Sequence, residues 1–132
     1  MKTFPLSIGT PDGLLFQDNV ERVCVRSVTG DLAILADHIN YCTALGMGEA
    51  AVVLEDGTRR TAACIGGMLS VMDGACHLLA TTFEWKEDID LSRAEAAKAK
   101  AEERLQADLD EKELRLAEAK LHRALVRIGV AK

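Results

Sequence analysis

The stretch Glu87-Asp88-Ile89-Asp90-Leu91-Ser92-Arg93-Ala94 divides the sequence into two parts of different composition. Before it, Val, Thr, Gly and Cys are frequent and turn dipeptides recur, which favours β-strands. After it there is no Pro, a single Gly (Gly129), and a dense mixture of Ala, Leu, Lys, Arg and Glu, which favours helices. Asp88 and Asp90 can each cap a helix N-terminus. We therefore expect an α+β chain, with a β domain over residues 1–86 and a helical domain over residues 87–132.

The first part has many short apolar runs separated by turn signals about every 8–12 residues, which predicts an antiparallel β-sandwich or barrel. Residues 4–8 are expected to form the first strand, with Pro5 at a sheet edge. Asp56-Gly57 is typical of a type I′ hairpin turn. Gly66-Gly67 indicates a bulge or a close backbone approach rather than a phosphate loop, because no helix follows it.

The second part predicts two helices in an antiparallel hairpin. The segment 108–110 interrupts the helical pattern, and Asp110 with Glu113 resembles a capping box. One stripe at helical spacing lies on each side of this break. Before it, the stripe is Leu91, Ala94, Lys98, Ala101 and Leu105, with Ala97 beside it; after it, the stripe is Leu114, Ala117, Leu121, Ala124, Leu125 and Ile128. Because Ala buries little apolar area, we expect the contact between the helices to be only modestly stable.

The charges are distributed unevenly. Residues 1–84 carry 5 basic and 10 acidic side chains, whereas residues 85–132 carry 11 of each, so the net charge of −5 belongs to the first part. No basic face stands out, which argues against a nucleic-acid partner. The longest uncharged run, residues 61–72, is too short and too Gly-rich to cross a membrane, and residues 1–10 lack the apolar core of a signal peptide.

The cysteine and histidine positions give no sign of a metal site. The four cysteines form no C-x-x-C pair, and the three histidines do not have the spacing of zinc ligands. This pattern is typical of a reducing compartment, and Cys42 is expected to be a buried apolar residue. No P-loop, G-x-S-x-G or H-E-x-x-H motif occurs, so we expect no catalytic residues and no enzyme activity.

One group of residues in the helical part could bind an anion. Arg123 and Arg127 are four residues apart and so share a face, and an antiparallel hairpin returns them beside Asp90 and Arg93. Guanidinium groups brought together in this way repel one another unless an anion or carboxylates lie between them, and Arg is well shaped for phosphate. The alternative is that the carboxylates of Glu84, Glu87, Asp88 and Asp90 neutralise them as weak surface pairs.

Several stretches resemble the epsilon subunit of F-type ATP synthases, and the resemblance covers essentially the whole chain. They are Thr10-Pro11-Asp12-Gly13, the run from Thr29 to His38, Gly66-Gly67-Met68-Leu69, and Ile89-Asp90-x-x-Arg93-Ala94, which matches the I/L-D-x-x-R-A motif associated with ATP in some bacterial members. The sequence departs from the family at Ala33, where Gly is common, and at Ala36-Asp37, where Pro-Gly is common.

The resemblance implies a non-catalytic central-stalk rotor subunit that couples proton flow to ATP synthesis. Its β-sandwich would dock on the gamma subunit and the c-ring, with Asp31, Asp37 and His38 facing the ring. Its helices, when extended, would reach the alpha and beta catalytic subunits and block ATP hydrolysis. It would lie on the cytoplasmic face of a bacterial plasma membrane, held there by other subunits, or less expectedly on the stromal face of a thylakoid.

The resemblance also implies a regulatory ligand. No cofactor is required, but ATP would bind the closed hairpin at Glu84, Ile89, Asp90, Arg93, Ala94, Arg123 and Arg127. Two other functions stay open at this point. One is a free-standing ATP-sensing or ligand-binding module that uses the same Arg residues without a rotor. The other, weaker one is an enzyme with chemistry around His38 and Cys42.

Overall fold

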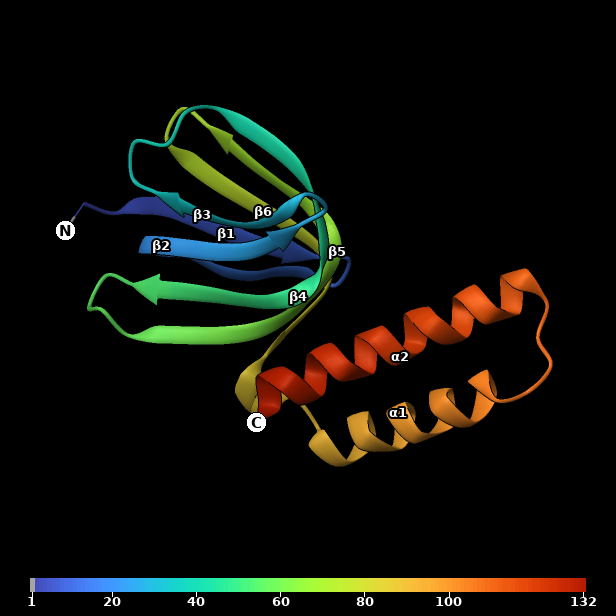
Figure 1. Ribbon diagram of the computed structural model, residues 1–132. Helices are drawn as coiled ribbons and strands as arrows, with labels where there is room; N and C mark the ends of the chain where they lie inside the picture. Colours follow the sequence, from blue (N-terminus) through green and yellow to red (C-terminus); the bar gives the residue numbers. More distant parts are fainter. Residues whose placement is uncertain (1) are drawn as a thin grey trace.

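The computed structural model describes residues 2–132 and contains a β-sandwich followed by a helical hairpin (Figure 1). The hairpin projects from one side of the sandwich, and the C-terminus returns to the junction between them. The strands are β1 (Phe4–Thr10), β2 (Gly13–Ser27), β3 (Gly30–Leu35), β4 (Tyr41–Leu54), β5 (Arg59–Met72) and β6 (Ala75–Trp85). A 3₁₀ turn, η1 (Lys86–Asp88), leads to α1 (Leu91–Leu105) and α2 (Glu111–Ala131). The expected fold class is confirmed.

The strands form one sheet in the order β1-β6-β5-β4-β2-β3, and an additional pairing between β1 and β2 closes it on itself. All of these pairings are antiparallel except β1–β6, which is parallel. β1 therefore lies between two strands and is not the edge strand that Pro5 indicated. The backbone tolerates this proline because the recorded pairing with β6 begins one residue later, at Leu6.

Alternation of side chains along the strands places the core inside this closed sheet. In β6, for example, Cys76, Leu78 and Ala80 are buried whereas His77 and Leu79 are exposed. Edge-to-face aromatic pairs close the end of the core next to the helices, where the Trp85 ring lies 5.0 Å from Phe83 and 5.8 Å from Phe16, between ring centroids.

The turns differ in detail from the sequence expectation. Asp56 does not have the positive φ that a type I′ turn needs; Gly57 alone has it (87°), as in a three-residue hairpin loop. The type I′ geometry occurs instead at Asp73 (φ 50°) and Gly74 (φ 83°). The expected bulge at Gly66-Gly67 is also absent, because both neighbouring ladders run through β5 there without a shift of register. Close approach explains this glycine pair, since a Cβ on Gly67 would lie 2.0 Å from the carbonyl oxygen of Leu79.

The two helices begin at the residues that the capping signals predict. The Asp90 carboxylate accepts the backbone N–H of Arg93 at 3.1 Å, and the Asp110 carboxylate accepts that of Glu113 at 2.8 Å. The Glu113 side chain does not complete a capping box, because its carboxylate accepts a bond from Arg104 instead, at 2.9 Å.

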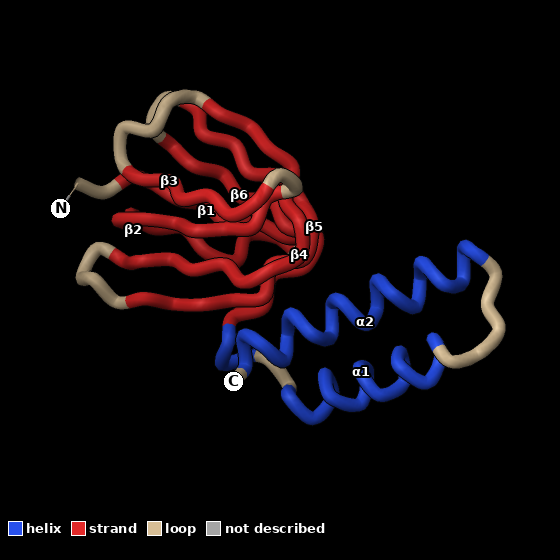
Figure 2. Tube along the Cα trace, viewed as in Figure 1, coloured by secondary structure: helices blue, strands red, loops and turns tan. Residues whose placement is uncertain are grey.

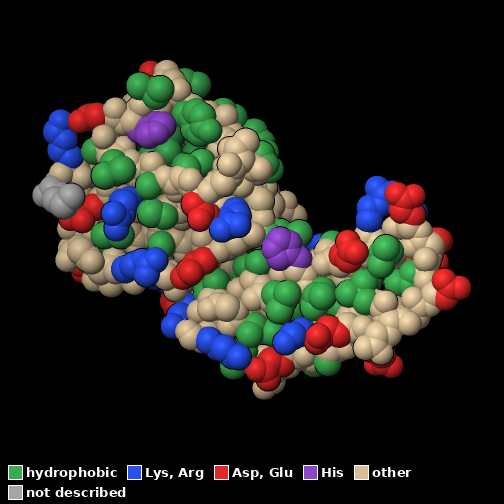
Figure 3. Space-filling view, in the orientation of Figure 1, with side chains coloured by type: hydrophobic (Ala, Val, Ile, Leu, Met, Phe, Trp, Pro, Cys, Tyr) green, Lys and Arg blue, Asp and Glu red, His purple; other side chains and the backbone are tan. Residues whose placement is uncertain are grey.

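The contact between the helices is formed mainly by small buried residues, as expected. Figure 3 shows hydrophobic side chains along the line where α1 and α2 meet. The buried residues here are Ala94, Ala101, Ala117, Ala124 and Ile128. Leu114 and Leu125 belong to the predicted stripe, but they are 38% and 44% exposed. They lie at the margin of the stripe, where the small α1 side chains cannot reach across to cover them.

Only α2 packs extensively on the sandwich, against β4 and β5 (Figure 2). Ala51, Ala63 and Ile65 are buried there, although they alternate with core residues and so face outward from the sheet. We infer that α2 covers this outward face. Neither helix is long and apolar enough to cross a membrane, within the described part of the chain.

Candidate functional site

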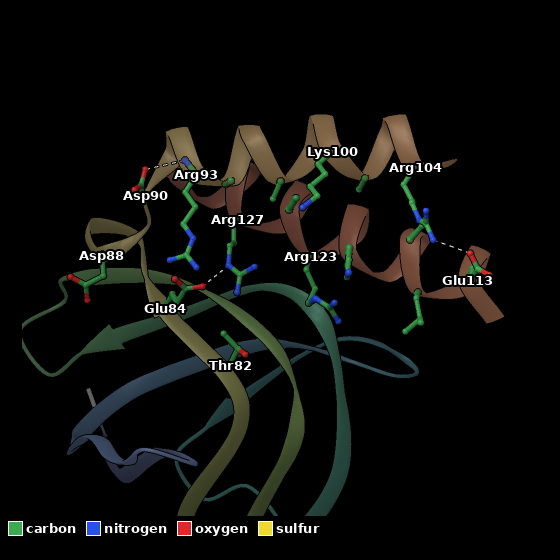
Figure 4. A pocket seen from close by; sticks show the side chains of 17 residues that line it. Thr82, Glu84, Asp88, Asp90, Arg93, Lys100, Arg104, Glu113, Arg123 and Arg127 are labelled. Carbon is green, nitrogen blue, oxygen red and sulfur yellow. Dashed lines mark hydrogen bonds and ion pairs between the residues drawn. The ribbon is translucent and has the colours of Figure 1, made fainter. Parts of the chain in front are cut away.

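A groove of about 880 Å³ lies between α1, α2 and the end of β6 (Figure 4). Its floor is apolar and small, formed by Ala94, Ala97, Ala101, Ala117 and Ala124, with Leu116 at one side. Its walls are charged: six basic side chains and four acidic ones line it, which leaves an excess of two positive charges. This positive excess occurs in a chain whose net charge is −5.

Six of the seven residues predicted to bind ATP line this groove: Glu84, Asp90, Arg93, Ala94, Arg123 and Arg127. Ile89 does not line it, because it is the residue at which η1 ends and the chain turns towards α1. Backbone N–H groups near this turn are already used: Ile89 donates to the Lys86 carbonyl at 3.3 Å and Ala94 donates to the Asp90 carbonyl at 3.0 Å. The two predicted backbone positions therefore offer a ligand no free N–H group.

The charged side chains of the groove are only partly neutralised. Arg127 donates to Glu84 at 2.5 Å, and both side chains are about one-third exposed. Among residues 2–132, neither Arg93 nor Arg123 forms an ion pair with a carboxylate. In Figure 4, Arg93 and Arg127 lie near Glu84, whereas Arg123 lies further along the groove. The three Arg residues thus line one groove, as expected, but do not meet at a single point.

The groove has further lining residues that were not predicted as ligand contacts: Thr82, Asp88, Ala97, Lys100, Ala101, Arg104, Glu113, Leu116, Ala117, Lys120 and Ala124. For two of the basic residues, helical spacing indicates that they belong to the groove. Lys100 follows Arg93 by seven residues, and Lys120 precedes Arg127 by seven residues, so each shares a helix face with a predicted ligand residue.

The residues predicted to face a c-ring do not form a single patch. Asp31 lies at the start of β3, where Arg26 holds its carboxylate through bonds of 2.9 and 3.3 Å. Asp37 and His38 follow the other end of that six-residue strand. Asp37 adopts a positive φ of 66° and pairs with Lys2 at 2.7 Å.

An apolar band crosses the outer face of the sandwich over β2, β1, β6 and β5, at positions whose side chains are exposed. Strand pairing places Leu14 of β2 opposite Gly9 of β1, Gly9 opposite Leu79 of β6, and Leu79 opposite Met68 of β5. Leu14, Leu79 and Met68 are 65%, 64% and 45% exposed. A contiguous row of exposed apolar side chains marks a contact surface more strongly than scattered single residues do.

The thiols occupy three kinds of environment: Cys24 is partly exposed, Cys42 is exposed, and Cys64 and Cys76 are buried. Cys64 and Cys76 lie in the core, where burial raises the pKa of Cys64 to about 12 and that of Cys76 to about 11. Cys42 was expected to be buried, but it is exposed, because it pairs with Ser70 on the outward side of β4 and β5. No cluster of potential metal ligands occurs within residues 2–132.

Comparison with protein families matches both parts of the chain. Residues 3–86 match the beta-sandwich domain of the ATP synthase delta/epsilon chain, and residues 87–132 match the long alpha-helix domain of the same chain. The protein belongs to the ATP synthase delta/epsilon chain family. The expectation drawn from the resemblance is therefore confirmed at this level.

Relatives in this family are named ATP synthase epsilon chain and match over nearly their whole length. The chain is 42% identical to that of Bacillus velezensis over 131 residues, covering 99% of this chain and 98% of the relative. It is 37% identical to that of Caldanaerobacter subterraneus subsp. tengcongensis over 130 residues, covering 98% and 94%.

Two solved structures share the fold. A chain of the Euglena gracilis mitochondrial ATP synthase aligns with a TM-score of 0.85 at 24% identity, over 98% of this chain and 81% of that one. A chain of the Tetrahymena thermophila mitochondrial ATP synthase central stalk and c-ring aligns with a TM-score of 0.71 at 13% identity, over 99% and 98%.

Proposed function

We propose that this protein is the epsilon subunit of an F-type ATP synthase: a non-catalytic part of the central stalk that couples proton flow to ATP synthesis. The match of both domains to one family supports this assignment, as do relatives of nearly the same length. The observation that most supports the assignment is that a closed β-sandwich is joined to a helical hairpin whose contact is lined mainly by Ala. Such a chain has one part suited to docking and another suited to movement.

The sandwich serves as the docking part. The apolar band of Leu14, Leu79 and Met68 has the composition of an interface core and contacts the gamma subunit. The end of the sandwich that carries Asp37 and His38 faces the c-ring. These contacts hold the subunit at the cytoplasmic face of a bacterial plasma membrane as a peripheral protein.

The hairpin serves as the regulatory part, with ATP in the groove of the closed form. Arg93 and Arg123 have no carboxylate partner within residues 2–132, and a triphosphate relieves the repulsion between them. Arg127 exchanges its bond with Glu84 for a bond to the phosphates. Asp90 keeps one carboxylate oxygen for the nucleoside, since its other oxygen caps α1.

ATP favours the closed hairpin because it binds the groove only when the helices are together. The shift equals the difference in affinity between the closed and extended forms. The apolar floor consists largely of Ala, so a small difference is sufficient. At low ATP the helices extend beside gamma, reach the alpha and beta subunits, and block rotation in the direction of hydrolysis.

Co-purification with the gamma subunit, with and without ATP, tests the rotor assignment. We expect the full chain and a shortened chain of residues 1–86 both to retain gamma, because the apolar band lies entirely within the sandwich. Failure of the full chain to bind gamma, together with retained ATP binding, would leave a free-standing ATP-sensing module as the function.

Titration calorimetry on the isolated full chain tests the ATP site. Arg123→Ala with Arg127→Ala should weaken ATP binding by about 1.5–3 kcal/mol for each lost contact with the phosphates. Arg115→Ala is the matched control, since Arg115 lies on α2 but outside the groove. Equal affinity in the double variant and the control would contradict the ATP assignment and leave the rotor assignment unaffected.

A further inference from the structure

The basic residues of the groove form two facing rows. On α1 they are Arg93, Lys100 and Arg104, and on α2 they are Lys120, Arg123 and Arg127. The α1 positions are separated by seven and four residues and the α2 positions by three and four, so each row follows one face of its helix. Figure 4 shows Lys100 directed into the groove between Arg93 and Arg104.

Each row is neutralised at one end only. Arg127 pairs with Glu84 at one end, and Arg104 pairs with Glu113 at the other, at 2.9 Å. Within residues 2–132, Lys100 and Lys120 form no ion pair with a carboxylate, and the same holds for Arg93 and Arg123. The middle of the groove is therefore its most electropositive part, while Asp88 and Asp90 lie at the Arg127 end.

The row on α1 is longer than the phosphate chain of a nucleotide. Arg93 and Arg104 are eleven residues apart, or about 16 Å along a helix. A nucleotide whose nucleoside lies beside Asp90 extends its three phosphoryl groups only part of this distance. Lys120 and the far half of the α1 row then have no role in binding it.

We propose that the groove binds linear inorganic polyphosphate along its length, with Lys100, in the middle of the α1 row, and Lys120, at the far end of the α2 row, as the contacts that a nucleotide does not reach. An unbranched chain with one negative charge per repeat matches two straight rows of cations on a narrow apolar floor. Lys100 and Lys120 supply compact charges, and the Arg residues supply bidentate contacts. The proposal rests on the proposed function only in requiring the closed hairpin, and it needs no nucleoside.

Binding assays on the isolated full chain test this, with three phosphate ligands: orthophosphate, tripolyphosphate and a polyphosphate long enough to span both rows. Affinity should rise with chain length, and the longest ligand should show the steepest loss of affinity with added salt, because it releases the most counterions. Lys100→Gln with Lys120→Gln should weaken binding of the longest ligand by about tenfold or more.

Two further variants make the result specific. Lys112→Gln with Lys132→Gln removes the same charge from outside the groove and should leave binding within twofold of the original chain. Lys100→Arg with Lys120→Arg retains the charge and should retain binding, which separates loss of contact from loss of folding. Equal weakening in the inside and outside pairs, or an affinity that does not depend on chain length, would overturn the proposal.

ATP titrations separate this proposal from the proposed function. Asp90→Asn should weaken ATP binding but should not weaken polyphosphate binding, because Asp90 lies at the nucleoside end of the groove and its loss removes only a negative charge beside the polyanion. ATP binding without polyphosphate binding overturns the polyphosphate proposal alone. Polyphosphate binding without ATP binding supports it and removes only the nucleotide assignment.

Discussion

Arg127 of α2 donates to Glu84 of β6, and this ion pair ties the last turns of the hairpin to the strand that leads into it. The two side chains are 30% and 32% exposed, which is less than most of the other ion-paired residues, so solvent screens this pair less. Among residues 2–132 it is the one ion pair that joins a helix of the hairpin to a strand of the sandwich.

Glu84→Gln should loosen α2 from the sandwich when no ligand is bound. We expect a loss of up to about 1 kcal/mol, the upper range for a partly exposed pair, seen as faster hydrogen exchange over residues 124–130. Glu113→Gln is the control, because it removes the Arg104 pair at the far end of the hairpin. Equal acceleration in both variants would show that the Glu84 pair has no special role.

The junction should respond to acid through Glu87. A backbone N–H bond and then Arg60, at 2.7 Å, lower the pKa of this carboxyl below its usual 4.5. A lowered pKa stabilises the folded state above pH 4.5, and this contribution is lost as pH falls through the lower, folded value. Arg60 also lies 3.7 Å from the ring centroid of Trp85, so Trp85 fluorescence should change below pH 4.5. Glu87→Gln should remove this step, and an unchanged pH profile in that variant would refute the assignment.

Gly67→Ala should be among the most damaging substitutions of a glycine. Its φ is 122°, and a Cβ would lie 2.0 Å from the carbonyl oxygen of Leu79, in backbone that cannot move without disturbing β6. We expect a loss of about 3 kcal/mol in urea unfolding. Gly74→Ala has a positive φ of 83° but open space around the new methyl, so it should cost only about 1–2 kcal/mol. Similar losses at both positions would mean that the close approach is unimportant.

Thiol reactivity should distinguish Cys42 from Cys64 and Cys76. At pH 8, Cys42 should react rapidly with Ellman's reagent because it is exposed. Cys64 and Cys76, with pKa values of about 12 and 11, stay protonated and shielded, and should react only after unfolding in urea. Cys42→Ser should remove the fast phase, and its persistence in that variant would place Cys42 in a less accessible environment than the fold indicates.

The two candidate ring-facing regions should behave differently, because β3 separates them. Asp31→Arg places a second positive charge beside Arg26 and should cost stability without altering attachment to the membrane sector. His38→Glu should weaken the coupling of ATP hydrolysis to proton pumping while sparing the fold. Proton-pumping assays on reassembled enzyme would check both, and a coupling defect from Asp31→Arg alone would reverse the assignment of the two ends.

Local chemistry accounts for the parts of the fold that the sequence predicts well. The Asp90 and Asp110 caps, the Ala-rich contact and the strand alternation depend on neighbours within a few residues. The parallel β1–β6 pairing joins segments about seventy residues apart, and nothing in either segment encodes its partner. The turn at Asp56-Gly57 was assigned wrongly because the same dipeptide suits two loop lengths, and strand pairing decides between them.

In the groove, too, some residues could be predicted from local sequence patterns and others could not. Helical spacing correctly predicted that Arg93, Arg123 and Arg127 line one groove, because an antiparallel hairpin constrains where each helix face points. Ile89 was included through the family motif, and it falls outside because η1 turns the chain there, which no periodic pattern reveals. Lys100 and Lys120 were overlooked although their seven-residue spacing from Arg93 and Arg127 was visible in the sequence.

The Ala-lined contact between α1 and α2 bears on how quickly the hairpin can close. Ala has no side-chain rotamers to lose, so burying Ala94, Ala101, Ala117 and Ala124 carries almost no cost in side-chain entropy. Two helices that meet through such residues have no search for matching rotamers to complete before they fit. Re-closure then depends on bringing the helices together and on the charges beside them, and the hairpin can open and close many times without becoming trapped in misfitted packing.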